Sequence, residues 1–218
     1  LADLQPTHCA IAFDLPGPTF RHKEFKEYKA QRPPTPPELR QQFDYIRLVM
    51  DAFNIPMFEK EGYEADDILG TLCHQAEKLQ IETVILTGDT DALQLVSPWV
   101  RVQLSYSVQK KAIYDEYAVR ERYGGLGPQS VADIKALQGD SSDNIPGVPG
   151  IGPKTAIRLL NEFKSVKGIY DHLEEVTSAK IRESLRDNRE QALLAKKLTT
   201  ISRHVPISLN LTTSHFWK

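Results

Sequence analysis

The stretch Thr83-Val84-Ile85-Leu86-Thr87-Gly88-Asp89-Thr90-Asp91 decides the fold class, because a short apolar run ends there in a turn with two carboxylates. A run of this length bounded by glycine and aspartate is typical of a buried strand. Similar runs lie at residues 8–13, followed by Asp14, and at 100–104. Helical patterns separate the first run from the second. The alternation predicts an α/β fold with a mainly parallel central sheet flanked by helices.

Two helices are expected before the second strand. The capping pattern Thr35-Pro36-Pro37-Glu38 predicts a helix start, and residues 64–73 carry acids in the first turn of another helix. In the first helix, apolar side chains recur at spacings of three and four, which predicts a face turned toward the core. These residues are Leu39, Phe43, Ile46, Met50 and Phe53.

Beyond about residue 115 the strand patterns stop. Short amphipathic helices separated by Gly, Pro and Asn turns are predicted at residues 119–123, 131–137, 154–163, 179–185 and 189–198. We therefore divide the chain into a core at residues 1–114, a helical region at 115–205 and a linker or tail at 206–218.

Composition narrows the class of protein. The 218 residues carry a net charge of −2, with 40% hydrophobic and 26% charged residues, which is ordinary for a globular protein. No apolar run approaches the length of a membrane span. The two cysteines have no metal or redox spacing, so we expect a reduced, cytosolic protein. Residues 21–47 and 150–197 each carry a local charge of +3, which favours a polyanionic partner.

Carboxylates are the strongest chemical signal. The carboxyl ends of parallel strands meet at one edge of a sheet, where ligands bind. Acids gathered there repel one another unless cations neutralise them, and oxygen-only ligands suit Mg²⁺ or Mn²⁺. Two such ions can hydrolyse a phosphodiester. The predicted metal ligands are Asp14, Glu64, Asp66, Asp67, Asp89, Asp91, Asp140 and Asp143.

Each acidic group has a structural alternative. The acids at residues 64–67 complement a helix dipole, and Asp89-Thr90-Asp91 is compatible with a turn closed by its own side chains. Convergence of all eight acids favours a metal site.

Two further segments favour binding to nucleic acid. Glycines at 147, 150 and 152, followed by Lys154-Thr155, predict exposed N–H groups at a helix start, which is an anion site. The alternative is a plain turn between helices. In residues 20–32, aromatic side chains alternate with cations, a pattern that stacks bases and holds phosphates. The alternative is a solvated helix face with aromatic residues in the core.

Four blocks together resemble a known family. They are FDLPGPTFRHKEFKEYKAQR from residue 13, GYEADDILGTL from 62, LTGDTDALQLV from 86 and GDSSDNIPGVPGIGPKTA from 139. In this order and spacing they resemble the 5′-nuclease domain of bacterial DNA polymerase I, in the flap endonuclease superfamily. The resemblance covers residues 8–205 and implies a PIN-like nuclease core followed by a helix-hairpin-helix DNA-binding region.

The resemblance also implies residue roles. Asp14, Glu64, Asp66 and Asp67 would serve one metal cluster, and Asp89, Asp91, Asp140 and Asp143 the second or the space between. Lys29 and Arg32 would act on the scissile phosphate as catalytic residues, and a K⁺ ion is expected at the helix-hairpin-helix. With the segments above, the predicted DNA-binding residues are Phe20, Arg21, Tyr28, Lys29, Arg32, Gly147, Gly150, Gly152, Lys154 and Thr155.

The implied activity is metal-dependent removal of 5′ flaps and primers. The expected partners are branched, flapped or nicked duplex DNA, RNA primer–DNA and a covalently linked polymerase domain, with the chain a monomer in the bacterial cytoplasm at the nucleoid. The family's opening strand and its Asp-Gly block do not appear before Asp14, so we expect the first strand to be missing from this sequence. A non-catalytic DNA-structure-binding module and a fragment of a longer DNA polymerase I are the alternatives.

Overall fold

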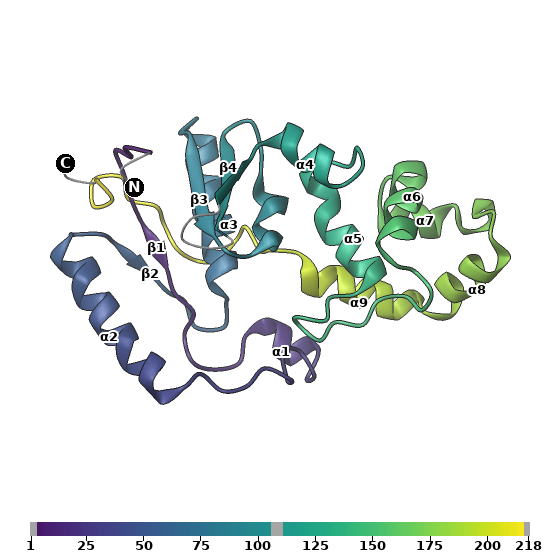
Figure 1. The fold of residues 1–218 in the computed structure, drawn as a ribbon, viewed down its shortest axis with the longest axis horizontal. Helices are drawn as coiled ribbons and strands as arrows, with labels where there is room; N and C mark the ends of the chain where they lie inside the picture. The colour runs from purple at the N-terminus through teal and green to yellow at the C-terminus, as the bar shows by residue number, and fades with distance from the viewer. Residues whose placement is uncertain (1–3, 106–110, 216–218) are drawn as a thin grey trace.

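A computed structural model describes residues 4–105 and 111–215 of the chain. The molecule is elongated, with the strands toward one end and a group of helices at the other (Figure 1). Its elements in chain order are β1 (Ile11–Ala12), α1 (Phe20–Glu24), α2 (Pro37–Ala52), β2 (Met57–Phe58), α3 (Ala65–Lys78), β3 (Thr83–Thr87), η1 (Thr90–Leu95), β4 (Val100–Ser105), β5 (Lys111–Tyr114), α4 (Glu116–Arg122), η2 (Pro128–Ser130), α5 (Val131–Gln138), α6 (Pro153–Phe163), α7 (Val166–Asp171), η3 (Leu173–Glu175), α8 (Ala179–Asp187) and α9 (Arg189–Thr199), where η marks a 3₁₀ helix.

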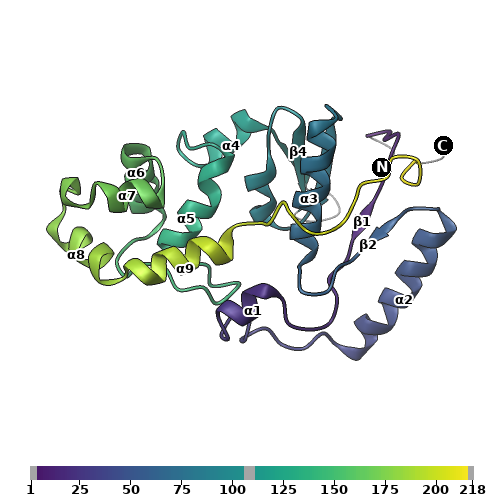
Figure 2. The same cartoon turned by 180° about the vertical axis from the view of Figure 1, so that it is seen from behind.

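The strands form two small, mostly parallel sheets. Strand β3 pairs parallel with β4, and β4 pairs antiparallel with β5. Strands β1 and β2 form a separate parallel pair. Helix α3 packs against both β1 and β3 and so connects the two sheets (Figure 2). The α/β class and the strands at residues 83–87 and 100–104 are confirmed, whereas β2 and β5 were not predicted.

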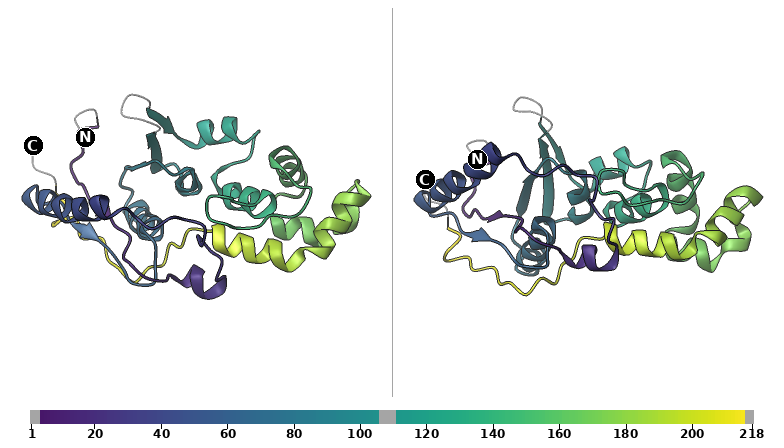
Figure 3. Two further views of the ribbon diagram at one scale, coloured as in Figure 1. Left: turned by 60° about the horizontal axis from the view of Figure 1, so that its bottom comes forward. Right: turned by 90° about the horizontal axis from the view of Figure 1, so that it is seen from below.

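The core is divided in the same way. One buried cluster lies between the β3-β4-β5 sheet and its helices, and includes Val100, Val102 and Leu104. A larger cluster lies among α5 to α9 and includes Leu137, Leu159 and the other apolar side chains of that region. Helix α9 runs along this helical region (Figure 3). The predicted helices beyond residue 115 are all present as α4, α5, α6, α8 and α9.

Helix α2 forms where the capping pattern predicts it, but the prediction that it faces the core is wrong. Leu39, Phe43 and Phe53 are 43%, 40% and 60% exposed, and no residue of α2 is buried in the described part of the chain. Arg47 of this helix pairs with Glu59 at 2.7 Å, and its guanidinium lies 4.8 Å from the ring centroid of Phe13. Periodicity predicted an amphipathic helix correctly, but the described residues provide no partner for its apolar face.

Part of residues 206–218, predicted to be a linker or tail, packs along α3, where Ile207 and Leu209 contact the cluster of Ile68, Leu72 and Val205. Gln75 donates a hydrogen bond to the carbonyl of Ile207 and accepts one from the amide of Leu209. The amide of Cys9 donates to the carbonyl of Ser214, which brings the two ends of the described chain together. The remaining tail residues, 216–218, lie outside the described residues. Within the described residues, no helix is long and apolar enough to cross a bilayer.

The loop that carries Asp140 and Asp143 is closed at its neck by two glycines. Gly139 has φ +85°, a conformation that L side chains rarely adopt. A Cβ atom on Gly147 would lie 2.3 Å from the backbone nitrogen of Gly139. The two glycines therefore let the loop ends cross in direct backbone contact, which fixes the position of the acids between them.

Substitution at this neck tests that account. We expect Gly147→Ala to lower the free energy of unfolding by about 1–3 kcal/mol, because the added methyl group must displace backbone. Urea unfolding followed by circular dichroism measures the change. Gly88→Ala is the control, because its Cβ would meet its nearest atom at 3.8 Å, an ordinary contact. Equal stability of the two variants would contradict the proposed packing.

Candidate metal centre

Three carboxylates from two segments meet where the α/β part of the chain, here called the body (residues up to 114), joins the helical region. Asp91 lies in η1, at the end of β3, and Asp140 and Asp143 lie in the loop after α5. One carboxylate oxygen from each lies within 4.8 Å of the other two. Oδ1 of Asp91 is buried and, its ion pair with Lys135 apart, has no hydrogen-bond partner among the described residues. This is the arrangement of a cation site.

A second group of carboxylates adjoins the first and surrounds Asp66. Burial and the negative charges of Asp89, Asp91, Asp14 and Glu64 raise the pKa of Asp66 to about 7. Burial also raises the pKa of Asp91, to about 6, against the opposing effect of Lys135. Oδ1 of Asp14 accepts a hydrogen bond from the amide of Ala65 at 2.7 Å, which ties β1 to the start of α3. The carboxylates crowd together enough to favour a proton or a cation.

Residues 28–32 bring cations and a phenol to these acids. Lys29 Nζ lies 2.8 Å from Glu64 Oε1, and Arg32 Nη2 lies 2.5 Å from Asp143 Oδ1. The Tyr28 hydroxyl lies 3.0 Å from a carboxylate oxygen of both Glu64 and Asp143. Burial and those two charges raise the pKa of Tyr28, so it stays a neutral donor. Its single proton serves only one carboxylate at a time.

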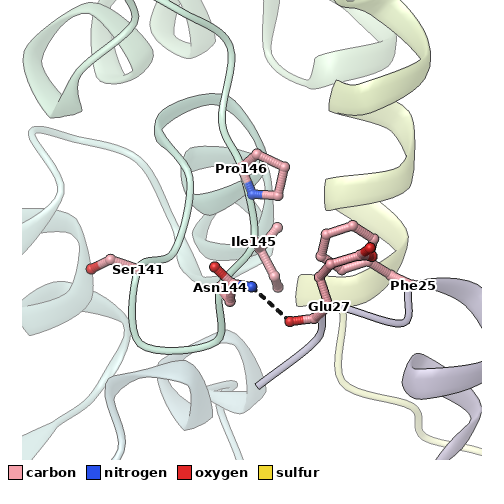
Figure 4. A pocket seen from close by; sticks show the side chains of 6 residues that line it. All are labelled: Phe25, Glu27, Ser141, Asn144, Ile145 and Pro146. Carbon is pink, nitrogen blue, oxygen red and sulfur yellow. Dashed lines mark hydrogen bonds between the residues drawn. The ribbon is translucent and has the colours of Figure 1, made fainter. Parts of the chain in front are cut away.

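The same segment packs against the loop at residues 139–147. The amide nitrogen of Lys29 donates to the carbonyl of Asp143, and the Asn144 side chain donates to the carbonyl of Glu27 at 2.7 Å. Between the two segments lies an open cavity of about 250 Å³ with Phe25 and Ile145 on its apolar side (Figure 4). These backbone contacts hold the cations in register with the acidic loop.

Asp67 and Arg21 differ from their predicted roles. The Asp67 side chain is 0% exposed, and its two oxygens accept hydrogen bonds at 2.7 and 2.8 Å from Arg21. They also accept the amides of Glu64 and Ser202. Arg21 is 3% exposed and donates in addition to the carbonyls of Leu198 and Thr200, so it is not placed to contact DNA. The pair joins α1, α3 and the end of α9. Asp67 contacts the acidic group through the backbone of Glu64 and through Arg21, whose Nη1 also lies 3.5 Å from Glu64 Oε2.

The aromatic side chains of residues 20–32 also differ from the predicted stacking surface. Tyr28 is 2% exposed and belongs to the helical core, against which Phe25 packs. Phe20 is partly buried against Tyr63, with ring centroids 5.9 Å apart. The alternative of aromatic residues in the core therefore describes this segment better. The sequence pattern did not distinguish it, because apolar packing and base stacking use the same residue types.

The glycine-rich segment leads into α6, as predicted. Gly152 is the N-cap, Pro153 is the first helical residue, and no side chain caps the helix. Gly150, Gly152 and Lys154 are exposed and Thr155 is partly exposed, whereas Gly147 is packed into the loop neck. The first-turn N–H groups of α6 and the Lys154 ammonium therefore form a positive, accessible surface.

The donor set at the acidic cluster fits hard divalent ions. Among the described residues that line the site, the available ligands are carboxylate oxygens, with no thiolate or imidazole beside them. Burial and neighbouring negative charges raise the pKa values of Asp66 and Asp91. At Asp140, by contrast, burial is outweighed by hydrogen bonds from Lys135 and Ser142, which lower its pKa. An α/β body with clustered acids beyond its strand ends, joined to a helical region, is the arrangement expected of a metal-dependent nuclease.

The chain belongs to the 5′-3′ exonuclease family. Residues 1–124 match the model of the 5′-3′ exonuclease N-terminal resolvase-like domain, and residues 126–217 match that of the C-terminal SAM fold. The chain is 48% identical over 216 residues to DNA polymerase I of Bacillus caldotenax and 45% identical over 212 residues to that of Bacillus subtilis (strain 168). Both alignments cover 97% of this chain and 24% of the relative, so the chain spans about a quarter of their length.

Solved structures agree with the family. The fold is similar to that of T5 5′-exonuclease with bound zinc, with a TM-score of 0.73 and 25% identity over 91% of this chain and 76% of that one. T5 D15 protein co-crystallised with metal ions gives a TM-score of 0.76 at 25% identity, over 91% and 77% of the two chains. The predicted α/β fold, the nuclease class and the family resemblance are confirmed.

The Arg21–Asp67 pair yields a stability prediction. We expect Arg21→Met to cost about 3–5 kcal/mol of unfolding free energy, because it leaves the Asp67 carboxylate buried without its counter-ion. Arg32→Met, which removes an arginine 49% exposed, should cost less than about 1 kcal/mol. Chemical unfolding of both variants measures the difference. A stable Arg21→Met variant that had lost only DNA binding would restore the role predicted from sequence.

The raised pKa of Asp66 predicts a pH dependence without metal. Between about pH 4 and pH 7 the folded chain binds more protons at Asp66 than the unfolded chain, so stability falls as pH rises through this window. Asp66→Asn should remove more than about 1 kcal/mol of that fall. Urea unfolding in chelator at pH 5 and pH 8 measures it. Identical pH dependence in both proteins would show that Asp66 does not carry the effect.

Proposed function

We propose that the chain is a structure-specific 5′ nuclease that hydrolyses phosphodiesters near the 5′ end of flapped or nicked DNA, by a mechanism using two divalent ions. The observation that carries the proposal is the convergence of carboxylates from four segments at the junction of the body and the helical region. A surface with that much unneutralised negative charge repels a nucleic acid unless cations are bound. With cations, it becomes a site for a phosphate.

We assign the carboxylates to two ions. Asp91, Asp140 and Asp143 would hold one, and Asp14, Glu64 and Asp66 the other, with Asp89 between them. When bound, Mg²⁺ or Mn²⁺ supplies an activated water and stabilisation of the leaving 3′ oxygen. The close approach of the oxygens of Asp91, Asp140 and Asp143 supports the first assignment. The effect of Asp14, Glu64 and Asp89 on the pKa of Asp66 supports the second.

Lys29 and Arg32 are assigned to the phosphate. Each already places a positive group against a carboxylate of the cluster, Glu64 and Asp143 respectively. Positive groups fixed beside the reacting phosphate stabilise the charge that develops in the transition state. The hydrogen bonds from Tyr28 and from the amide of Lys29 keep this segment in place, so Tyr28 acts as a positioning residue.

The helical region is assigned to duplex DNA. Helix α6 begins with uncapped N–H groups beside Gly150, Lys154 and Thr155, and contacts to the phosphate backbone carry no sequence preference. A K⁺ ion at this turn, as in a helix-hairpin-helix, is part of the proposal. T5 D15 flap endonuclease, which has this fold, was crystallised as a pseudo-enzyme-product complex with DNA and metal ions.

We also propose a cellular setting. The relatives of this chain are bacterial DNA polymerase I proteins four times its length, which supports a covalently linked polymerase domain. A monomeric nuclease of this kind would remove flaps and RNA primers during replication and repair, in the cytoplasm at the nucleoid.

Asp91→Asn tests the metal assignment. We expect cleavage of a labelled 5′-flap DNA in Mg²⁺ or Mn²⁺ to fall at least a hundredfold, because one ion loses a charged ligand, while DNA binding changes less than threefold. Gel analysis of products and an anisotropy titration measure the two effects. Asp44→Asn, at an exposed acid of α2, is the control and should cleave normally.

The same assay separates the alternatives. Chelator should abolish cleavage by the unsubstituted chain, and binding should weaken with salt. Salt-sensitive binding without metal-dependent cleavage would identify a non-catalytic DNA-structure-binding module instead. Full activity of Asp91→Asn would contradict the metal assignment.

A further inference from the structure

A lysine outside the predicted site lies inside the acidic cluster. Lys135, in α5, places its ammonium 2.5 Å from Oδ2 of Asp140 and forms an ion pair with Oδ1 of Asp91. The side chains of Lys135, Asp91 and Asp140 are 15%, 15% and 8% exposed. This ion pair is therefore largely sheltered from water.

The Lys135 ammonium occupies carboxylate oxygens that a divalent ion would need as ligands. The oxygens of Asp91 and Asp140 are two of the three that lie within 4.8 Å of one another, with Asp143 as the third. The Lys135 ion pair is the neutralising contact of Asp91 Oδ1, which has no hydrogen-bond partner among the described residues. An ammonium and a divalent cation cannot both sit on these oxygens without strong like-charge repulsion.

We propose that Lys135 is an exchangeable counter-ion, which holds Asp91 and Asp140 together in the metal-free protein and withdraws its ammonium when a divalent ion binds. It is a positioning residue for the metal ligands. The inference rests on the proposed function in one respect, that Asp91, Asp140 and Asp143 hold an ion.

The side chain is suited to such an exchange. Its backbone is fixed in α5, which packs against α9, whereas four flexible methylene groups carry the ammonium. The loop that carries Asp140 is itself fixed by its glycine neck and by hydrogen bonds from Ser142 to Asp140. Withdrawal of the lysine therefore need not move the carboxylates.

Exchange has two consequences that can be measured. The divalent ion must displace Lys135, so its apparent affinity is lower than that of the bare carboxylates. In the absence of metal, loss of the lysine leaves the carboxylates of Asp91, Asp140 and Asp143 to repel one another, so the metal-free protein becomes less stable.

A titration with Mn²⁺ alone tests the proposal. Lys135→Met keeps the length of the side chain without its charge, and we expect it to lower the Mn²⁺ dissociation constant five- to tenfold by calorimetry. Its melting temperature should fall in chelator and recover in Mn²⁺. Lys135→Arg, which restores a cation, should bind Mn²⁺ within twofold of the unsubstituted chain.

Lys196→Met is the matched control. Lys196 pairs with Asp133 of the same helix α5 at 2.8 Å, in a comparable partly buried ion pair that contains none of the assigned ligands. Its loss should leave the Mn²⁺ dissociation constant unchanged, even if it lowers the melting temperature.

The outcomes distinguish this inference from the proposed function. If the unsubstituted chain binds Mn²⁺ and Lys135→Met binds it equally or more weakly, the exchange is contradicted while the metal centre stands. If no protein binds Mn²⁺, the metal centre itself is contradicted. A Lys135→Met chain that folds only with Mn²⁺ supports the counter-ion role, and one that stays unfolded with Mn²⁺ contradicts it.

Discussion

Repulsion among the carboxylates that meet beyond β1 and β3 and in the loop after α5 is the constraint on which the rest of this structure depends. Oxygens of Asp91, Asp140 and Asp143 lie within 4.8 Å of one another, and burial and neighbouring negative charges raise the pKa values of Asp66 and Asp91. The chain meets that repulsion with positive groups from separate segments, Lys29 and Arg32 after α1 and Lys135 in α5. A cation neutralises these carboxylates only if its segment is held beside them. The glycine neck of residues 139–147 and the contacts of residues 25–32 with that loop serve this purpose.

A different ion pair supports the frame behind the site. Arg21 and Asp67 are almost fully buried, and together they use two backbone carbonyls near the end of α9 and two backbone amides, of Glu64 and Ser202. Most hydrogen-bonding atoms of the two side chains therefore have partners, which is the condition under which a buried ion pair is tolerated. One consequence is that the start of α3, which carries Glu64 and Asp66, is tied directly to the helical region. Glu64 and Asp66 are therefore held in one frame with Asp140 and Asp143 of the loop after α5.

Much of this arrangement was predictable from the sequence, and the failures have identifiable causes. Strand β3 and the acids after it follow from a local pattern, because burial of a short apolar run and an Asp-containing turn depend on adjacent residues. The helices beyond residue 115 follow from their periodicity in the same way. The partners of Asp67 and Arg21 did not follow, because a carboxylate ligand and a carboxylate in a buried ion pair are identical in sequence. Lys135 was missed because only the tertiary fold places it beside Asp91. For α2 the error has the other sign. Its apolar periodicity predicted burial against the core, but that face is exposed among the described residues.

Tyr28 connects the acidic cluster to the core of the helical region. Its ring belongs to the core of the helical region, while its hydroxyl reaches both Glu64 of the body and Asp143 of the loop. A single hydroxyl proton cannot satisfy two carboxylates, so one of them depends on a cation, from Lys29 or Arg32 in the metal-free protein. A divalent ion that took over this neutralisation would free those cations for a phosphate without moving the ring. The packing of Tyr28 therefore allows charge to be redistributed at the site while the helical region keeps its place relative to the acids.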